Sequence, residues 1–345
     1  MTTAPAQTLT ASRPTSAPPA PSVAPGGRDP WFDNAKLVLV ALVVVGHSWT
    51  LLPEPAWIDL TYDWLYLWHI PAFVLVTGYL SRRFTYTPRN LRRLVTTVVV
   101  PYLVFEGLFA AFRVYVGGET LERLWLNPHW PMWYLAALFF WRLATPFFQR
   151  TKHPMAIAVA VSLVGGFWGV ETLDLSRVTG LLPFFVAGVL VEDRHLEWLR
   201  TAFARRAATV VLVAGVALTP FVEWGISTEW LYYRTAYGDL HETWLSGTAI
   251  RGLLLAVSFA MSAAALALIP RDRTWFTRLG AGSLVVYLFH GFVVKGAEFA
   301  GFPAWAADHA ALSFGLATLV ALALALTLSW RPVRKPLQKV VTPVT

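Results

Sequence analysis

The sequence contains no cysteine, and charged residues make up only 14% of its 345 residues. The absence of cysteine excludes disulfide bonds, thiolate catalysis, iron–sulfur clusters and cysteine-ligated zinc. Soluble domains carry about 25% charged residues, so the shortage of charge, beside a hydrophobic share of 56%, indicates a chain that lies mostly within a membrane. We also find no close pair of carboxylates, no metal-ligand spacing and no glycine-rich phosphate loop, and therefore expect no metal and no permanently bound cofactor.

Apolar stretches recur after residue 27, and most approach the roughly 20 residues that a helix needs to cross a bilayer. We predict an all-α polytopic membrane protein with about ten transmembrane helices, at about 34–52, 62–80, 94–116, 131–149, 154–170, 178–192, 207–224, 248–269, 282–300 and 310–330. Residues 28–335 would form one membrane domain. Residues 1–27, rich in Ala, Pro, Ser and Thr, are predicted to form a disordered tail, and residues 336–345 a second, short tail.

The net charge of +8 indicates membrane topology and no nucleic-acid partner, because the basic residues lie in short connections between the predicted spans. Most Lys and Arg fall on the same side as residues 1–27, whereas the opposite connections contain Arg123, Arg177 and Arg234 beside many acidic residues. Cytoplasmic connections carry an excess of Lys and Arg. We therefore expect both tails to be cytoplasmic, with the protein in the inner (plasma) membrane and the lipid bilayer around it.

The first predicted span carries Asp33, Lys36 and His47 within DNAKLVLVALVVVGH. Lys36 and His47 are separated by about three turns, or roughly 16 Å of rise, so they lie on nearly the same helix face, with Asp33 within about 40° of it. Ionisable residues inside a span usually face the bundle interior or a wet cavity. One interpretation is a helix-end anchor plus a histidine hydrogen-bonded between helices. The other is a reactive site.

A second histidine, His69, lies in the next span within LWHIPAFVLVTGY. It is about 18 Å from Ser81 at the inner end of that span, so His47 and His69 are at similar depth on consecutive antiparallel helices. Two adjacent imidazoles would not both carry a charge in a site of low dielectric constant, so at least one should be neutral and able to act as a base. The matched depth therefore favours a functional site.

Further polar residues are expected at membrane depth, namely Glu106, Arg142, His290 and Lys295. Glu106 and Lys295 are each about 20 Å from their inner ends, so they either pair with each other or line a cavity open to the outside. Arg251, near the outer end of its span, is expected to extend its guanidinium group to the membrane surface.

Residues 81–93 contain five arginines, among them Arg89, Arg92 and Arg93. Such a cluster determines topology, but the arginine fork also binds phosphate bidentately. At the cytoplasmic mouth of a helix bundle, the cluster would suit a phosphorylated donor.

Together these residues resemble the integral-membrane O-acyltransferases of acyltransferase family three, especially the branch of sugar O-acetylases. The resemblance extends over nearly the whole chain after residue 27. The motifs that carry it are Asp33, Lys36 and His47; His69, Pro71, Phe73, Gly78 and Tyr79; Arg89, Arg92, Arg93, Pro101 and Tyr102; and MWYLAALFFWRL, LLPFFVAGVL and GSLVVYLFH. Leu37 departs from the pattern, which has glycine after the basic residue.

The resemblance implies transfer of an acyl group, usually acetyl, from cytoplasmic acetyl-CoA as co-substrate to a hydroxyl of a carbohydrate or glycoconjugate acceptor. His47 would be the catalytic base or would carry the acyl group transiently, and His69 would support it. Lys36 and Asp33 would fix the base or guide the donor. The CoA phosphates would be bound by Arg89, Arg92 and Arg93. The acceptor would be bound by Glu106, Trp133, Tyr134 and His290.

An alternative from a different class is a proton-coupled transporter or flippase for a polar or lipid-linked solute, with the histidines and Glu106 as a proton relay. The concentration of the site in the first two spans and the arginine-rich mouth on one side weigh against it. Acetyl-CoA binding or hydrolysis by the purified protein, set against solute uptake by vesicles, distinguishes the two.

The predicted topology can be tested with single cysteines, because the native chain has none. Cysteines near Gly118 and Asp239 should react with an impermeant thiol reagent added outside the cell, and cysteines near Arg89 and Arg200 should be protected. Labelling near Arg89 from outside would reverse the orientation and, with it, the side from which the donor is expected.

Overall fold

The computed structural model describes residues 29–121 and 123–341, and helices are the only regular secondary structure in these ranges. The predicted all-α class is confirmed. Helix is present in each of the ten predicted stretches, but seven helices are long and apolar enough to cross a membrane, or up to eight if a bent pair counts as one span. The count of ten spans and the orientation stay predictions, and the predicted tail at residues 1–27 lies outside the described residues.

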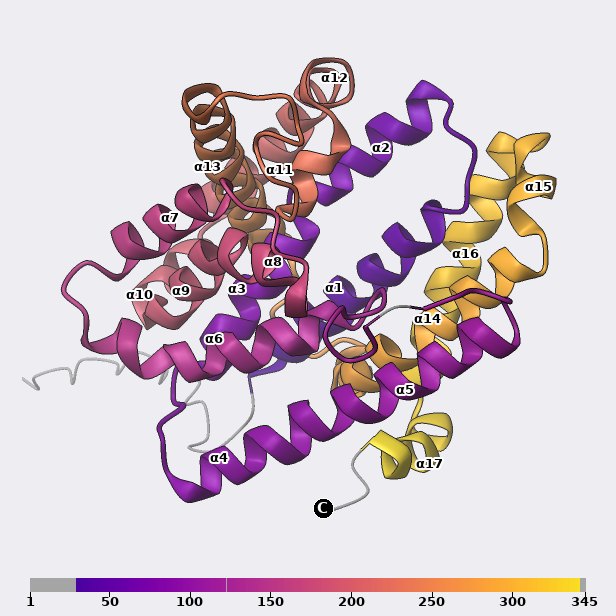
Figure 1. Ribbon diagram of the computed structural model, residues 1–345. Coiled ribbons are helices and arrows are strands. Elements are labelled where there is room, and N and C mark those ends of the chain that lie inside the picture. The colour runs from indigo at the N-terminus through magenta and orange to yellow at the C-terminus, as the bar shows by residue number, and fades with distance from the viewer. Residues whose placement is uncertain (1–28, 122, 342–345) are drawn as a thin grey trace, which may run out of the picture.

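The elements follow one another with mostly short connections (Figure 1). The seven long spans are α1 (Pro30–Trp49); α2 (Ala56–Tyr66) with α3 (His69–Ser81); α4 (Pro88–Leu94), η1 (Val95–Val99) and α5 (Val100–Tyr115); α11 (Ala202–Val216), α12 (Thr219–Phe221) and η3 (Val222–Ile226); α13 (Trp244–Leu268); η5 (Thr277–Gly282) with α14 (Ser283–Phe299); and α16 (Ala310–Ser329). The other elements are α6 (Trp133–Arg150), α7 (Pro154–Gly165), η2 (Thr172–Asp174), α8 (Leu175–Gly180), α9 (Leu182–Leu190), α10 (Asp193–Leu199), η4 (Thr228–Tyr232), α15 (Phe302–Ala307) and α17 (Arg331–Val341).

Helix α1 is packed on several sides, against α3, α14, α16 and η5. It begins at Asp29, whose carboxylate accepts a hydrogen bond from the backbone N–H of Trp31 (2.9 Å), with Pro30 as the first helical residue. Asp29 and Pro30 both favour a helix start. The Asp29 carboxylate satisfies a backbone N–H that has no partner within the helix, and proline has no backbone N–H that would need one. Asn34 and His47 are themselves buried, so these polar residues of α1 face the protein interior.

The second span begins at Ala56, earlier than predicted, and is interrupted between α2 and α3. The carbonyl of Trp68 at the break accepts a hydrogen bond from the hydroxyl of Ser262 on α13 (3.2 Å). Interruptions of this kind persist in membranes where neighbouring helices satisfy the freed backbone groups. The break makes His69 the first residue of α3.

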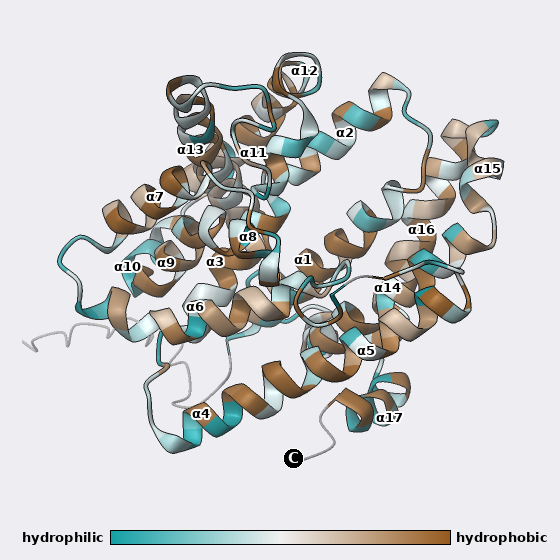
Figure 2. Ribbon diagram, viewed as in Figure 1, coloured by the Kyte–Doolittle hydropathy of each residue, from teal (hydrophilic) through white to brown (hydrophobic). Residues whose placement is uncertain are grey.

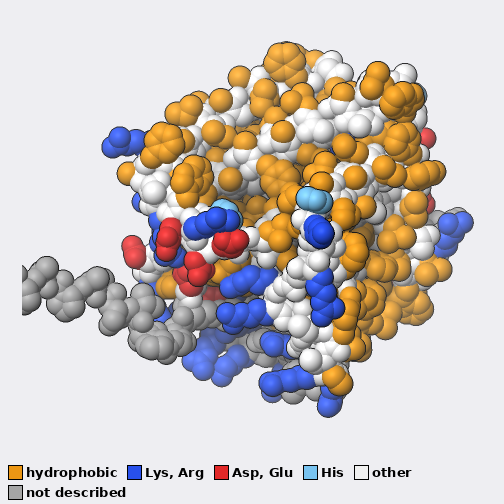
Figure 3. Space-filling model, turned by 90° about the vertical axis from the view of Figure 1, so that its left-hand side faces the viewer, with side chains coloured by type: hydrophobic (Ala, Val, Ile, Leu, Met, Phe, Trp, Pro, Cys, Tyr) orange, Lys and Arg blue, Asp and Glu red, His pale blue; other side chains and the backbone are white. Residues whose placement is uncertain are grey.

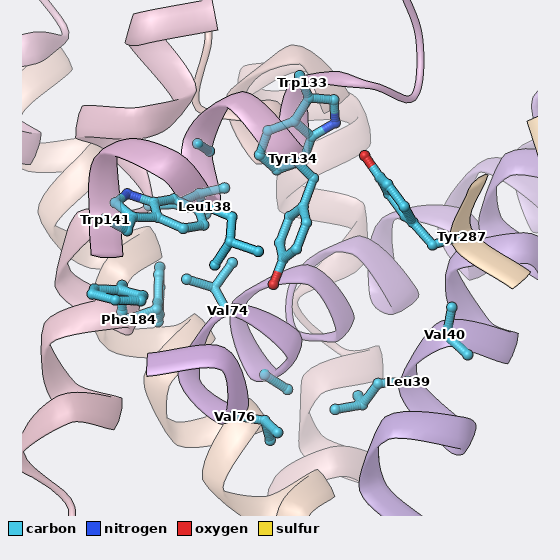
Figure 4. Close-up of a cluster of buried hydrophobic side chains, with 14 of the residues drawn as sticks. Leu39, Val40, Val74, Val76, Trp133, Tyr134, Leu138, Trp141, Phe184 and Tyr287 are labelled. Atoms are coloured by element: carbon cyan, nitrogen blue, oxygen red, sulfur yellow. The ribbon is translucent and has the colours of Figure 1, made fainter. Parts of the chain in front are cut away.

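Helices α3 and α9 approach each other closely because glycines face each other across their contact. A Cβ atom on Gly78 would overlap the carbonyl of Phe185, and one on Gly188 would overlap the carbonyl of Leu75. Small residues allow such close backbone approach between membrane helices. Helix α6 packs over this pair with Trp141, whose ring stacks on Phe185 with centroids 5.5 Å apart. Figure 4 shows Trp141 within a cluster of buried hydrophobic side chains.

The surface divides into apolar and basic regions. Hydrophobic residues dominate α5, α7 and α16, while hydrophilic residues gather on α4, α10 and the connections (Figure 2). On the side that includes α10, Lys and Arg gather across the lower part of the face and hydrophobic side chains cover much of the rest (Figure 3). Large exposed apolar surfaces mark membrane or partner contact, which agrees with the seven candidate spans.

Residues 336–341, predicted as part of a C-terminal tail, belong to α17. This helix contacts α14 and α16, and its Val341 is buried. The cytoplasmic position of this end stays a prediction.

The close contact of α3 and α9 should make Gly188 intolerant of any side chain. We expect Gly188→Ala to lower the thermal unfolding midpoint or to prevent insertion, because the added methyl group has no room. Gly252→Ala on α13 is the matched control: nothing lies within 4 Å of its Cβ position, and alanine favours a helix by about 1 kcal/mol over glycine. Equal midpoints for the two variants, measured in detergent, would contradict the packing described here.

Candidate active site

His47 lies near the end of α1, where it is 5% exposed and lines a cavity of about 580 Å³. We call this the His47 cavity. Its wall combines aromatic rings with charged groups, including Tyr62, Tyr66, Trp130, Trp133, Tyr232, Arg113, Arg177, Glu229, Arg234, Lys295 and Glu298. Several of these residues belong to the connections on the side predicted to be outside the cell.

The hydrogen-bond partner of His47 is His290 on α14, with 2.9 Å between His47 Nδ1 and His290 Nε2. The other ring nitrogen of His290, Nδ1, lies 2.7 Å from the carbonyl oxygen of Tyr287. A carbonyl only accepts, so His290 Nδ1 carries the hydrogen and, in the neutral ring, Nε2 accepts. His47 Nδ1 must then donate to it. The remaining nitrogen of a neutral His47, Nε2, therefore keeps its lone pair and can accept a proton.

His69 is fully buried but is not the hydrogen-bond partner of His47. Its Nδ1 donates to the carbonyl of Leu65 (2.8 Å), and its Nε2 has no hydrogen-bond partner among the described residues. A Cβ atom on Gly46 would lie 3.5 Å from that Nε2, so His69 packs beside α1 one residue before His47. The sequence indicated the proximity of His69 to this part of α1 and missed the pairing with His290.

Trp130 covers the His47 ring, with ring centroids 4.3 Å apart. The preceding residue, His129, is held by Glu106 of α5: the carboxylate accepts hydrogen bonds from the backbone N–H of His129 (2.9 Å) and from its ring. Glu106 is fully buried. Its structural role is thus to fix the connection that places Trp130 over the candidate base, and nothing in the sequence spacing of these residues signals this.

A second cavity, of about 520 Å³, lies toward the other end of the molecule, and we call it the Lys36 cavity. Its basic wall residues are Lys36, Arg83, Arg93 and Arg142. Lys36 also forms an ion pair with Asp33 one turn earlier on α1 (2.7 Å). The predicted residues Arg89 and Arg92 are exposed and lie outside this wall. Arg83 and Arg142 are the cations here that the sequence did not single out as donor ligands.

A thin layer separates the two cavities. Trp133 lines the His47 cavity, whereas the next residue, Tyr134, lines the Lys36 cavity together with Tyr287. The Tyr134 hydroxyl lies 2.5 Å from that of Thr77, and the Tyr287 hydroxyl donates to the carbonyl of Pro131 (2.7 Å). Figure 4 shows Trp133, Tyr134 and Tyr287 side by side. Tyr287 precedes His290 by about one helical turn, roughly 5 Å, so the histidine pair lies close to both cavities.

Two other charged residues at membrane depth, Lys295 and Arg251, have protein partners. Lys295 pairs with Glu298 (2.8 Å). A pair with Glu106, one of the two possibilities that the sequence leaves open, is not formed. Arg251 was expected to reach the membrane surface, but it is 1% exposed. Its guanidinium donates to the carbonyl of Thr235 (3.4 Å) and lies 4.9 Å from the centre of the Tyr237 ring. It therefore anchors the connection between η4 and α13 instead of snorkelling.

Among the described residues, no group of three or more His, Asp or Glu side chains is arranged to hold a metal ion.

Comparisons with known proteins identify the family. The family described as an acyltransferase domain, acyltransferase family three, matches residues 29–330. Relatives include the nodulation protein NolL of Sinorhizobium fredii (strain NBRC 101917 / NGR234), 25% identical over 79% of this chain and 80% of the relative. Another is the nodulation protein NolL of Mesorhizobium japonicum (strain LMG 29417 / CECT 9101 / MAFF 303099), 23% identical over 78% and 77%. No solved structure matches. The chain is a multi-pass membrane protein that belongs to acyltransferase family three.

Proposed function

We propose that this acyltransferase moves an acetyl group from acetyl-CoA, bound as a co-substrate on the cytoplasmic side, to a hydroxyl of a carbohydrate or glycoconjugate. The observation that carries the proposal is the position of His47. Its Nε2 is left free to accept a proton by the His47–His290 hydrogen bond, in a polar and aromatic cavity that a thin layer separates from a basic one.

The Lys36 cavity suits the donor. Coenzyme A is a polyanion, and arginine binds phosphate through charge-assisted, often bidentate hydrogen bonds. Lys36, Arg83, Arg93 and Arg142 supply positive charge at its wall, while Arg89 and Arg92, exposed nearby on α4, remain candidates for the outer phosphates.

The His47 cavity suits a carbohydrate acceptor. Aromatic rings provide apolar faces and the charged side chains provide hydrogen-bond donors and acceptors, and such a combination is typical of small-molecule sites. Trp130 and Trp133 line the part of the wall that includes His47, with the Arg177 guanidinium 5.0 Å from the centre of the Trp133 ring. The acceptor hydroxyl would be placed against His47 Nε2.

In the proposed reaction, His47 Nε2 removes the proton of the acceptor hydroxyl as its oxygen attacks the thioester carbonyl. The C–S bond then breaks, the coenzyme A thiolate leaves and takes the proton from His47, and an ester and free coenzyme A result. His290 holds His47 in the required tautomer. Transfer through a transient acyl-histidine uses the same nitrogen and remains an alternative within the proposal.

His47→Ala should lower kcat for acetyl transfer about 10²–10⁴-fold, the usual contribution of a general base, while acetyl-CoA still binds. His47→Gln should not restore activity, because an amide forms hydrogen bonds but cannot take a proton. His290→Ala should reduce kcat less, since it removes orientation and not the base. The assay uses purified variants, a glycan extract as acceptor and a separate measurement of donor binding. Substantial turnover by His47→Gln would overturn the assignment of the base.

Neutralising the basic wall of the Lys36 cavity should weaken donor binding. Arg93→Gln and Arg142→Gln should each raise the KM for acetyl-CoA about tenfold or more, as expected for a lost charge-assisted contact, and leave the KM for acceptor nearly unchanged. Arg150→Gln, an exposed arginine at the end of α6, controls for the general loss of basic charge. If Arg93→Gln and Arg142→Gln raise this KM no more than Arg150→Gln does, the donor does not bind in this cavity.

A further inference from the structure

A third cavity lies where the first turn of α1 meets α3, α10 and α13. Its volume is about 250 Å³, and its wall is almost wholly apolar, with Trp31, Phe32, Leu199 and Leu266 among its residues. We call it the Trp31 cavity. Neither His47 nor Lys36 lines it, so it takes no part in the reaction proposed above.

Arginines gather beside the Trp31 cavity. The guanidinium of Arg271 lies 5.8 Å from the centre of the Trp31 ring, and its Nη2 is buried without a hydrogen-bond partner among the described residues. Burial, together with the like charges of Arg200 and Arg205, lowers the pKa of Arg271, while the carboxylate of Asp29 opposes this effect. The Asp29 carboxylate is already paired with Arg200 (3.3 Å), so the unpaired Nη2 of Arg271 is left without an anionic partner of its own in the described part of the chain.

The arrangement around Arg271 is fixed by the fold. The side-chain amide of Asn34 on α1 donates to the carbonyls of Pro270 (2.8 Å) and Asp272 (3.1 Å), on both sides of Arg271. The Trp31 ring nitrogen donates to the carbonyl of Leu266 (3.3 Å). The cavity and the arginine beside it therefore keep a constant relation to each other.

Exposed aromatic residues indicate that this region lies at the boundary of the bilayer. Trp198, which lines the cavity, is 55% exposed. Phe203, shortly after Trp198 in the chain, is 72% exposed, and Trp275, shortly after Arg271, is 76% exposed. Tryptophan is enriched at the level of the lipid headgroups. Basic pockets between membrane helices at this level suit acidic lipid headgroups.

We propose that the Trp31 cavity binds an acidic membrane phospholipid, with one acyl chain in the cavity and its phosphate held by Arg271. The apolar wall takes the chain, and the phosphate supplies the acceptor that Arg271 Nη2 lacks. Residues 1–28 of the same chain are a less suitable occupant, because they contain Arg13 and Arg28 and no acidic residue, so their charge has the same sign as that of the arginines.

The test measures lipid binding by native mass spectrometry, and thermal stabilisation, for the full chain in detergent. Phosphatidylglycerol and phosphatidylcholine with identical acyl chains are compared. Phosphatidylglycerol should bind the wild type at least about tenfold more tightly, the gain expected from one charge-assisted contact, and Arg271→Gln should abolish this preference. Arg273→Gln, an exposed arginine two residues further on, should keep it.

A second variant tests the cavity without changing charge. Ala263→Phe fills part of the Trp31 cavity and should weaken phosphatidylglycerol binding, whereas glycerol phosphate should not compete at concentrations that match the lipid. A photoreactive aromatic residue in place of Trp198 should crosslink to lipid. The proposal would be overturned if the wild type bound the two lipids equally, or if Arg271→Gln and Arg273→Gln showed the same lipid preference. It would also be overturned if Ala263→Phe bound phosphatidylglycerol as tightly as the wild type, or if the photoreactive residue crosslinked to residues 1–28. If Arg271→Gln fails to insert, the lipid comparison in the wild type and Ala263→Phe still decide it.

Discussion

The hydrogen bond between His47 and His290 is the interaction on which the rest of the site depends. It joins α1 to α14, helices separated by more than two hundred residues of chain, and its direction is fixed because His290 Nδ1 is already committed to a backbone carbonyl. In a bilayer an unpaired polar group costs several kcal/mol, so this bond is not readily exchanged for one to water. The free Nε2 of His47 is a consequence of that constraint.

The same constraint explains why buried charges in this protein hold irregular backbone in place. Glu106 satisfies the backbone of His129, and Arg251 donates to the carbonyls of Ser162 and Thr235. Both tie a connection to a long helix, and both connections contribute to the wall of the His47 cavity, through Trp130 and Arg234. An irregular wall at membrane depth is tolerated because it lines a cavity and its polar groups find partners in the protein.

The sequence was enough to predict the all-α class and the shared face of Asp33, Lys36 and His47, because helical periodicity and hydropathy are local properties. It was not enough to predict the partner of His47. Depth along a helix places His69 and His290 only along the membrane normal, and the rotation of each helix is decided by packing, such as the glycine contact between α3 and α9. For the same reason, the arginine count of residues 81–93 did not distinguish Arg83 and Arg93, at the Lys36 cavity, from Arg89 and Arg92.

In the proposed function, donor and acceptor reach the His47–His290 pair through opposite cavities. The most direct measurement uses sealed vesicles that contain the protein in one orientation, with acetyl-labelled acetyl-CoA on the side of residues 82–93 and a glycan extract on the other side. We expect labelled glycan on the acceptor side with the wild type, and none with His47→Gln. Transfer that occurs only when both substrates are on the same side of the membrane would contradict it.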